Sequence, residues 1–127
     1  MRVLVIEDDA LLCWLLEKIM NEKYEVICMN NGMDAWSWLS EGNACDLIIS
    51  DINMPSVSGI ELLENLRSSG LFHGIPVIIL SGCQESRAQC LELGARSYLI
   101  KPFEPRKLLS EVEFALEKYT EKAFDAK

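Results

Sequence analysis

The chain has 127 residues, of which half are hydrophobic and a quarter are charged. A chain of this length folds most simply as one domain that buries about two-thirds of its unfolded surface, so neither stapling disulfides nor disorder is expected. The 12 basic and 20 acidic side chains give a net charge of −8. This charge argues against direct binding to nucleic acid, which selects clustered Lys and Arg.

The five cysteines are odd in number and widely spaced, and most stand in apolar stretches: Cys13, Cys28, Cys45, Cys83 and Cys90. This pattern is typical of reduced core thiols in a cytosolic protein. The first apolar run, VLVI at 3–6, is too short for a signal peptide, and no later run is long enough to span a bilayer. We therefore expect a cytoplasmic protein that does not contact membranes.

Short apolar runs, most of them rich in β-branched residues, predict five strands, at 3–6, 25–29, 47–50, 76–80 and 97–100. Helical patterns lie between and after them, at about 10–21, 33–40, 59–68 and 84–93, and from about 104 onward. Local signals agree, because Ser58 and Glu61 have the spacing of a capping box and Gly94 stands where a helix should end. Pro105 suits a first helical turn.

Strands joined by helices run parallel with right-handed crossovers, and nearly continuous apolar strands require helices on both faces of the sheet. The predicted fold class is therefore α/β, a (βα)5 doubly wound five-stranded parallel sheet. We expect residues 1–120 to form this domain and residues 121–127 to be a C-terminal tail or the start of a linker. In such folds ligands bind outside the carboxyl ends of the strands.

Charged and hydroxyl side chains follow four of the five predicted strands: Glu7, Asp8 and Asp9 after the first, Asp51 after the third, Ser81 after the fourth and Lys101 after the fifth. Two unit charges about 4 Å apart repel by about 4 kcal/mol at an effective dielectric near 20. The acids therefore need a divalent cation, and carboxylate oxygens suit Mg²⁺ or Mn²⁺. A carboxylate nucleophile, such a metal, a lysine and a hydroxyl are the parts needed to transfer a phosphoryl group to Asp51.

Four motifs in this order give the chain a recognisable pattern: the acidic pair in VIEDD, the D-x-x-M-P-x-x-x-G of Asp51, Met54, Pro55 and Gly59, the SG of Ser81 and Gly82, and the KPF of 101–103. From residue 2 to about residue 119 the chain resembles the receiver domain of a two-component response regulator. The resemblance implies a flavodoxin-like sheet with strand order 2-1-3-4-5.

The resemblance also implies a chemistry. Asp51 would be the phosphoacceptor, taking the phosphoryl group from a phosphohistidine of a sensor histidine kinase or a histidine phosphotransfer protein. Mg²⁺, for which Mn²⁺ can substitute, would be held by Glu7 (mainly through water), Asp8, Asp51 and the backbone carbonyl of Asn53. The chain would assist its own phosphorylation and dephosphorylation as a signalling domain, not as an enzyme.

The resemblance further implies that Ser81 and Lys101 contact the phosphoryl oxygens and that the peptide between Lys101 and Pro102 is cis. Tyr98 would turn inward as Ser81 is drawn toward the phosphate. This change would alter a protein-interaction surface around the fourth helix, fifth strand and fifth helix. The downstream partner would be a separate protein or an effector domain beyond residue 127.

Several residues have competing interpretations. Asp9 precedes a helix, so an N-cap or solvated position is favoured over a metal ligand. Ser81 could instead cap a helix. Nine of the eleven residues at 10–20 are apolar, which predicts either a thick core with Trp14 tucked against the domain, or a docking surface for the phosphodonor that includes Cys13 and Leu16, as the resemblance implies. We favour docking.

Two other functions are compatible with an α/β fold. A phosphohydrolase of the haloacid-dehalogenase type would also form an aspartyl phosphate, but it resembles D-x-D, and Asn53 stands where its second acid would be. A flavodoxin-like flavin or nucleotide binder would need a phosphate-binding loop after the first strand, where this chain has EDDALL. Both are less favoured than the receiver.

Overall fold

The chain alternates strands and helices as the sequence predicts. The computed structural model describes the backbone of residues 1–54 and 57–125, and side chains as far as Glu117. The strands are β1 (Arg2–Ile6), β2 (Glu25–Met29), β3 (Leu47–Asp51), β4 (Val77–Ser81) and β5 (Ser97–Ile100). The helices are α1 (Ala10–Met20), α2 (Gly32–Ser40), α3 (Gly59–Ser68), α4 (Arg87–Glu92) and α5 (Pro105–Asp125).

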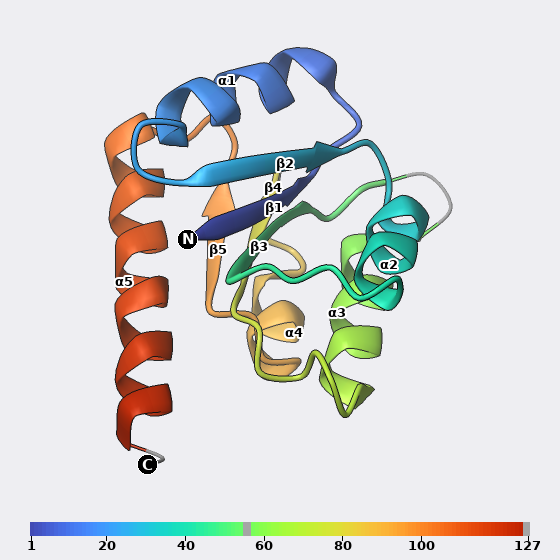
Figure 1. The fold of residues 1–127 in the computed structure, drawn as a ribbon. Coiled ribbons are helices and arrows are strands. Elements are labelled where there is room, and N and C mark those ends of the chain that lie inside the picture. Colours follow the sequence, from blue (N-terminus) through green and yellow to red (C-terminus); the bar gives the residue numbers. More distant parts are fainter. Residues whose placement is uncertain (55–56, 126–127) are drawn as a thin grey trace.

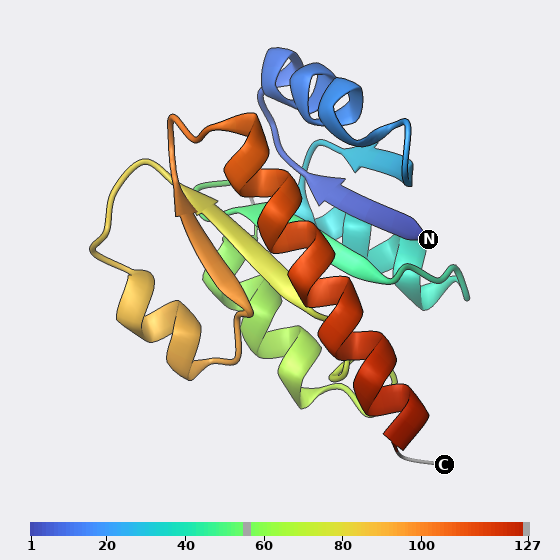
Figure 2. The same ribbon diagram turned by 90° about the vertical axis from the view of Figure 1, so that its left-hand side faces the viewer.

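The five strands form one parallel sheet in the order β2-β1-β3-β4-β5. Helices α1 and α5 cover one face, and α2, α3 and α4 cover the other (Figures 1 and 2). The predicted fold class and strand order are both confirmed. The chain runs from β1 outward to β2 and then returns to β3 on the other side of β1, so the strand order reverses between β1 and β3. Ligands bind at this position in doubly wound sheets.

Side chains from each strand alternate between two apolar cores, one under each layer of helices. Leu4, Ile48 and Ile79 pack with buried residues of α2 and α3. Val5 and Ile49 pack with residues of α1 and α5. Because both faces are covered, the central strands are apolar except near their carboxyl ends, where Ser50, Asp51 and Ser81 are buried.

The helix termini follow the predicted local signals. The Asp9 side chain accepts from two N–H groups of the first turn of α1, and the Ser58 side chain accepts from the Glu61 N–H at the start of α3. Gly94 has a φ of 98°, as expected after a helix. The predicted helix at 84–93 is shorter than expected, because Ser86 forms no side-chain cap and regular helix begins only at Arg87.

Two further predictions concern the chain as a whole. Among the described residues, no helix combines the length and apolar character needed to cross a membrane. All five cysteines are free, but Cys83 is exposed in the loop after β4, so it is not the core thiol that the sequence predicts. The backbone stays helical to Asp125; residues 126 and 127, at the end of the predicted tail, lie outside the described part.

Candidate functional site

Three acids meet at the carboxyl ends of β1 and β3. Ile6 pairs with Ser50 in the parallel register, so the next residues along each strand, Glu7 and Asp51, stand side by side. Carboxylate oxygens of Glu7, Asp8 and Asp51 all lie within 4.8 Å of one another. Glu7 and Asp51 are only 2% and 6% exposed, whereas Asp8 is open to solvent.

Lys101 reaches these acids from the end of β5. Its Nζ lies 2.9 Å from Oε1 of Glu7 and 3.1 Å from Oδ1 of Asp51. The Lys101 backbone N–H donates to the Ser81 carbonyl at 2.7 Å, which fixes the start of the side chain. The peptide between Lys101 and Pro102 is cis, as predicted. One ammonium group therefore partly compensates two buried carboxylates.

The cluster contains three acids and one lysine, so it carries an excess of negative charge. Burial raises the pKa of the Glu7 carboxyl, and the hydrogen bonds from Lys101 and the Asp9 N–H only partly oppose this. Burial would lower the pKa of Lys101, but its hydrogen bonds to Glu7 and Asp51 outweigh burial, so the pKa is raised. The lysine therefore stays charged at neutral pH, and the pocket still favours a further cation.

Asp51 is held rigidly at the end of β3. Its Oδ1 accepts from the Ile52 N–H at 2.9 Å as well as from Lys101. Among the described residues no hydrogen bond is made to Oδ2, so this oxygen is available. Gly59 packs so closely that an added Cβ would lie 2.6 Å from the Asp51 carbonyl oxygen, which explains the glycine at this position of the motif.

Ser81 and Tyr98 both hold the backbone of Cys83, in the loop after β4. The buried Ser81 Oγ accepts from the Cys83 N–H at 3.3 Å. The Tyr98 hydroxyl, on a side chain only 6% exposed, donates to the Cys83 carbonyl at 2.6 Å. Ser81 does not cap α4, whose N-cap is Ser86. The Cys83 backbone was not predicted as a junction, because no side-chain pattern marks a carbonyl group.

The structure gives less information about two residues of the Asp51 motif, Asn53 and Pro55. Asn53 is exposed in the loop after Asp51, and its role as a carbonyl ligand stays a prediction. Pro55, the proline of the same motif, lies outside the described residues. Asp9 serves as the N-cap of α1, with its Oδ1 3.0 Å from the Leu11 N, which confirms the structural interpretation.

The prediction for α1 is corrected in its details. Leu16 is completely buried, so it cannot contribute to a docking surface. Trp14, expected to be tucked inward under the alternative interpretation, is 53% exposed. The exposed apolar side chains are instead Leu11, Trp14 and Leu15. The sequence does not show which side of the helix faces the core, because apolar residues occur on all sides of it.

A largely apolar hollow of about 380 Å³ lies directly beside the acid cluster. Three leucines of α1 and the segment after β5 line it: Leu11, Leu12, Leu15, Lys101, Pro102 and Phe103, together with Asp9. The hollow therefore adjoins the lysine that contacts Asp51. Apolar surface beside a charged pocket is typical of a protein-docking site.

These groups provide what phosphoryl transfer to a carboxylate requires. The three acids fit Mg²⁺, because hard carboxylate oxygens are its preferred ligands and a partly exposed cluster leaves room for water. Asp51 offers a free carboxylate oxygen on a rigid strand end, and Lys101 and Ser81 come from the next two strands of the sheet. The arrangement is suited to an in-line attack by Asp51 on a phosphorus atom.

Comparison with known proteins gives a consistent result. The sequence model of the response regulator receiver domain matches residues 3–113. The chain is 38% identical over 119 residues to the uncharacterized transcriptional regulatory protein YbdJ of Bacillus subtilis, covering 91% of this chain and 51% of that protein. It is 29% identical to the chemotaxis protein CheY1 of Helicobacter pylori, covering 91% of this chain and 97% of that protein.

Solved structures agree with the sequence comparison. The crystal structure of a putative response regulator from Chloroflexus aurantiacus has a TM-score of 0.86 at 29% identity, covering 91% of this chain and 97% of that one. The receiver domain of a signal transduction histidine kinase from Syntrophus aciditrophicus has a TM-score of 0.85 at 32% identity, covering 92% and 90%. The chain spans about half the length of the first curated relatives that it matches.

Proposed function

Because the chain belongs to the response regulator receiver family, we propose that Asp51 accepts a phosphoryl group from a phosphohistidine of a sensor histidine kinase or a histidine phosphotransfer protein. An Asp51 carboxylate oxygen forms the new bond to phosphorus as the bond between phosphorus and the imidazole nitrogen breaks. The electron pair of that bond returns to the imidazole of the donor. The observation that carries the proposal is the free Oδ2 of a buried carboxylate beside Lys101.

The other residues of the site position and compensate charge. Lys101, already in contact with Asp51, pairs with one of the phosphoryl oxygens, and the Ser81 hydroxyl donates to another. The backbones of both residues are joined by the hydrogen bond between the Lys101 N–H and the Ser81 carbonyl, which places the two side chains on the same side of the site. The chain acts as a phosphoacceptor that assists its own phosphorylation and dephosphorylation rather than as an enzyme that turns over a separate substrate.

Glu7, Asp8, Asp51 and the backbone carbonyl of Asn53 hold Mg²⁺ or Mn²⁺ in this proposal, with Glu7 acting mainly through water. Both oxygens of Glu7 are engaged, by Lys101 and by the Asp9 N–H, which supports an indirect role. When bound, the metal neutralises charge on the acids and on the phosphoryl oxygens.

The backbone of Cys83 couples the phosphorylation site to the switch surface. Ser81 can donate its hydroxyl proton to a phosphoryl oxygen while it still accepts from the Cys83 N–H, and Tyr98 holds the carbonyl of the same residue. A movement of Ser81 toward the phosphate therefore pulls on the loop that leads into α4. This couples Asp51 to the surface formed by α4, β5 and α5, where a downstream partner binds.

The phosphodonor docks over α1. Leu11, Trp14 and Leu15 are exposed on this helix, and the hollow lined by Leu11, Leu15 and Phe103 borders Lys101. An apolar side chain of the donor that fills this hollow brings the neighbouring phosphohistidine to the open side of Asp51. Such an arrangement explains why a helix of a small soluble domain exposes large apolar side chains.

The output is a protein interaction. A regulator such as YbdJ has about twice the length of this chain, whereas CheY1 has nearly the same length. The downstream partner is therefore an effector domain or a separate protein. This domain does not bind nucleic acid directly, because its net charge of −8 repels phosphate groups. We place the protein in the cytoplasm, where sensor kinases expose their phosphohistidine.

A phosphotransfer experiment tests the proposal. A phosphorylated histidine phosphotransfer protein is mixed with the native chain, and label on both proteins is followed with time. Label should move to the native chain and not to Asp51→Asn. Transfer to the variant at the native rate would refute Asp51 as the acceptor.

A further inference from the structure

β2 is the outer strand of the sheet at the end opposite β5. The Glu25 N–H donates to the Met1 carbonyl at 3.0 Å, and the Met29 carbonyl accepts from the Glu7 N–H at 2.9 Å. Alternate residues of a parallel strand face opposite neighbours, so the N–H and C=O groups of Val26 and Cys28 point away from the sheet. Within the part of the chain that the structure describes, no strand pairs with this side of β2. The edge is open to an added strand.

An open hollow of about 390 Å³ lies beside this edge, between the end of β2 and α2. Its walls include Cys28, Met29 and Asn30 from the strand side, and Asp34, Trp38 and the C-cap residue Glu41 from the side of α2. Asp34 and Trp38 are four residues apart on α2 and Glu41 is its C-cap, so the three residues lie on one side of the helix. The hollow thus continues the strand edge as a groove with one aromatic and two acidic side chains.

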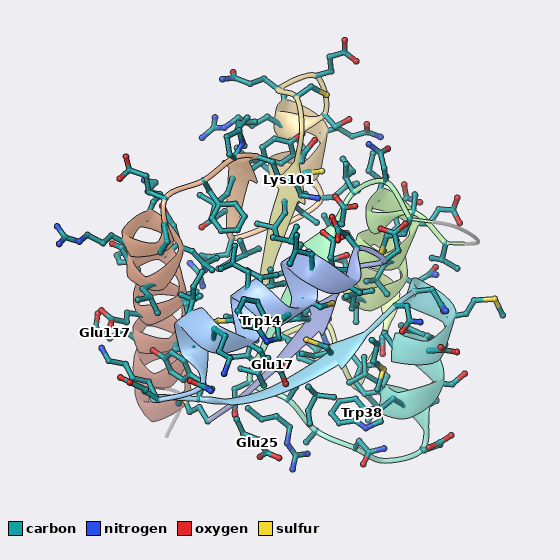
Figure 3. The ribbon with its side chains drawn as sticks, turned by 90° about the horizontal axis from the view of Figure 1, so that it is seen from above. Trp14, Glu17, Glu25, Trp38, Lys101 and Glu117 are labelled. Atoms are coloured by element: carbon teal, nitrogen blue, oxygen red, sulfur yellow. The ribbon has the colours of Figure 1, made fainter. Side chains whose placement is uncertain are left out.

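The chemistry of this groove selects a cation. None of the residues that line the hollow is basic, whereas Asp34 and Glu41 are both acidic and exposed. The Trp38 ring already attracts one cation of the chain, the Arg2 guanidinium, at 5.8 Å from its centroid. Two more acids lie near β2 (Figure 3): Glu17 on α1, and Glu25 at the start of the strand, which already pairs with Arg2 at 3.2 Å. Among the described residues neither Asp34 nor Glu41 forms an ion pair, so these two acids favour an added Arg or Lys.

We infer that the outer edge of β2 and the hollow beside it bind an extended, basic polypeptide segment of a partner protein. The backbone of the segment pairs with Val26 and Cys28 as an additional strand, and an Arg or Lys side chain on the α2 side enters the hollow between Asp34 and Glu41. A second copy of this chain is a poor occupant, because its net charge of −8 repels an acidic edge. The inference does not depend on phosphorylation of Asp51.

A synthetic peptide of alternating Arg and Val tests this surface directly. Calorimetric titration of the native chain should show binding to this peptide, with an affinity that falls as salt increases. A peptide of the same length with Glu in place of Arg should not bind. Equal binding of both peptides, or binding of neither, would overturn the inference.

Charge variants locate the site. The double variant Asp34→Asn/Glu41→Gln should lower the affinity for the basic peptide about fivefold, the effect of two partly exposed ion pairs. The matched control is Glu85→Gln/Glu92→Gln, which removes the same charge from exposed positions in and before α4 and should leave the affinity unchanged. Equal effects of the two double variants would mean that only net charge matters, which contradicts the inference.

The strand edge is tested by Val26→Pro. This change removes an N–H that points away from β1 and leaves the β1 ladder intact, so it should lower the affinity about fivefold. An unchanged affinity in a folded variant contradicts strand addition. If Val26→Pro does not fold, the result for Asp34→Asn/Glu41→Gln tests the inference instead.

Sedimentation of the native chain without peptide tests whether a second copy occupies the edge. A dimer that is lost in Asp34→Asn/Glu41→Gln would assign the edge to a second copy and overturn the proposal.

Discussion

At the scale of single residues, the site is governed by one lysine that faces two buried acids. Lys101 contacts Glu7 and Asp51 through one ammonium group, while burial raises the pKa of Glu7. Removal of this cation leaves two neighbouring carboxylates with no compensating charge in a poorly solvated position. The stability of the acid cluster should therefore depend on Lys101.

We predict that Lys101→Met lowers the free energy of unfolding by about 1 to 3 kcal/mol at neutral pH, discounted from a fully buried pair because the lysine is partly exposed. Urea titration measures the change, and Mg²⁺ should restore part of it. The control is Lys107→Met, which removes a largely exposed lysine from its pair with the half-buried Glu111 and should cost less than about 0.5 kcal/mol. Equal losses for the two variants would mean that the acids do not depend on Lys101.

Gly59 is the residue that allows Asp51 to take its position. Because an added Cβ would lie 2.6 Å from the Asp51 carbonyl oxygen and 2.8 Å from the Ile52 Cα, Gly59→Ala must displace the backbone that carries the acceptor. We expect a loss of about 1 to 3 kcal/mol in stability and slower phosphorylation. Gly74→Ala, where an added Cβ meets nothing within 4 Å, is the control; a Gly59→Ala protein that matches it in both measurements would contradict this explanation.

Glu111 makes a pH-dependent contribution to stability. The Ser97 hydroxyl donates to its carboxylate at 2.7 Å, which outweighs burial, and with Lys107 lowers the pKa below the ordinary value of 4.5. A lowered folded-state pKa stabilises the protein above the unfolded pKa, and this contribution is lost as pH falls through the folded value. The difference in unfolding free energy between the native chain and Glu111→Gln should therefore be constant near neutral pH and shrink below about pH 4.5. A difference that stays constant through acid titration would show that the Ser97 contact is not formed.

At the scale of elements, α1 combines a structural side and an exposed apolar side. Leu16 and Met20 are completely buried, whereas Leu11 and Trp14 are more than half exposed. The exposed side continues into the hollow that borders Lys101. Packing of this domain does not require these exposed side chains, so their substitution should affect docking more than folding.

We predict that Leu11→Ser slows phosphotransfer from a phosphohistidine protein about tenfold, the effect of losing one well-packed apolar contact. Labelling by a small-molecule phosphodonor should be unchanged, because that reaction needs only the acid site. Leu71→Ser is the matched control, since Leu71 is 85% exposed in the loop between α3 and β4. If both donors were slowed equally by Leu11→Ser, the helix would be acting on the site itself and the docking proposal would be wrong.

At the scale of the whole molecule, the sequence was sufficient for the fold and for most of the site. Strand ends are readable because charged and hydroxyl side chains follow the apolar runs of buried parallel strands, and Glu7, Asp51, Ser81 and Lys101 each stand at such an end. The parallel sheet then brings them to one edge. Side-chain phase was not readable where a helix is apolar all round, which is why Leu16 was wrongly placed on the surface.

Hydrogen bonds to main-chain groups could not be predicted from sequence patterns either. The junction at Cys83 depends on backbone groups that any residue provides, so no residue type predicts it. The start of α4 was placed too early because Gln84, Glu85 and Ser86 are compatible with a helix, whereas Ser86 forms no cap in the structure. These features require the three-dimensional arrangement of the loop after β4.

The central claim is that Asp51 accepts a phosphoryl group with the help of a divalent cation. Intact-mass spectrometry after incubation with Mg²⁺ and a small-molecule phosphodonor tests it most directly, with Asp51→Asn as the variant and Asp34→Asn as the matched control. We predict a single phosphoryl adduct on the native chain and on Asp34→Asn, and none on Asp51→Asn or in the presence of a chelator. An adduct that persists in Asp51→Asn, or none on the native chain with any divalent cation, would contradict the account.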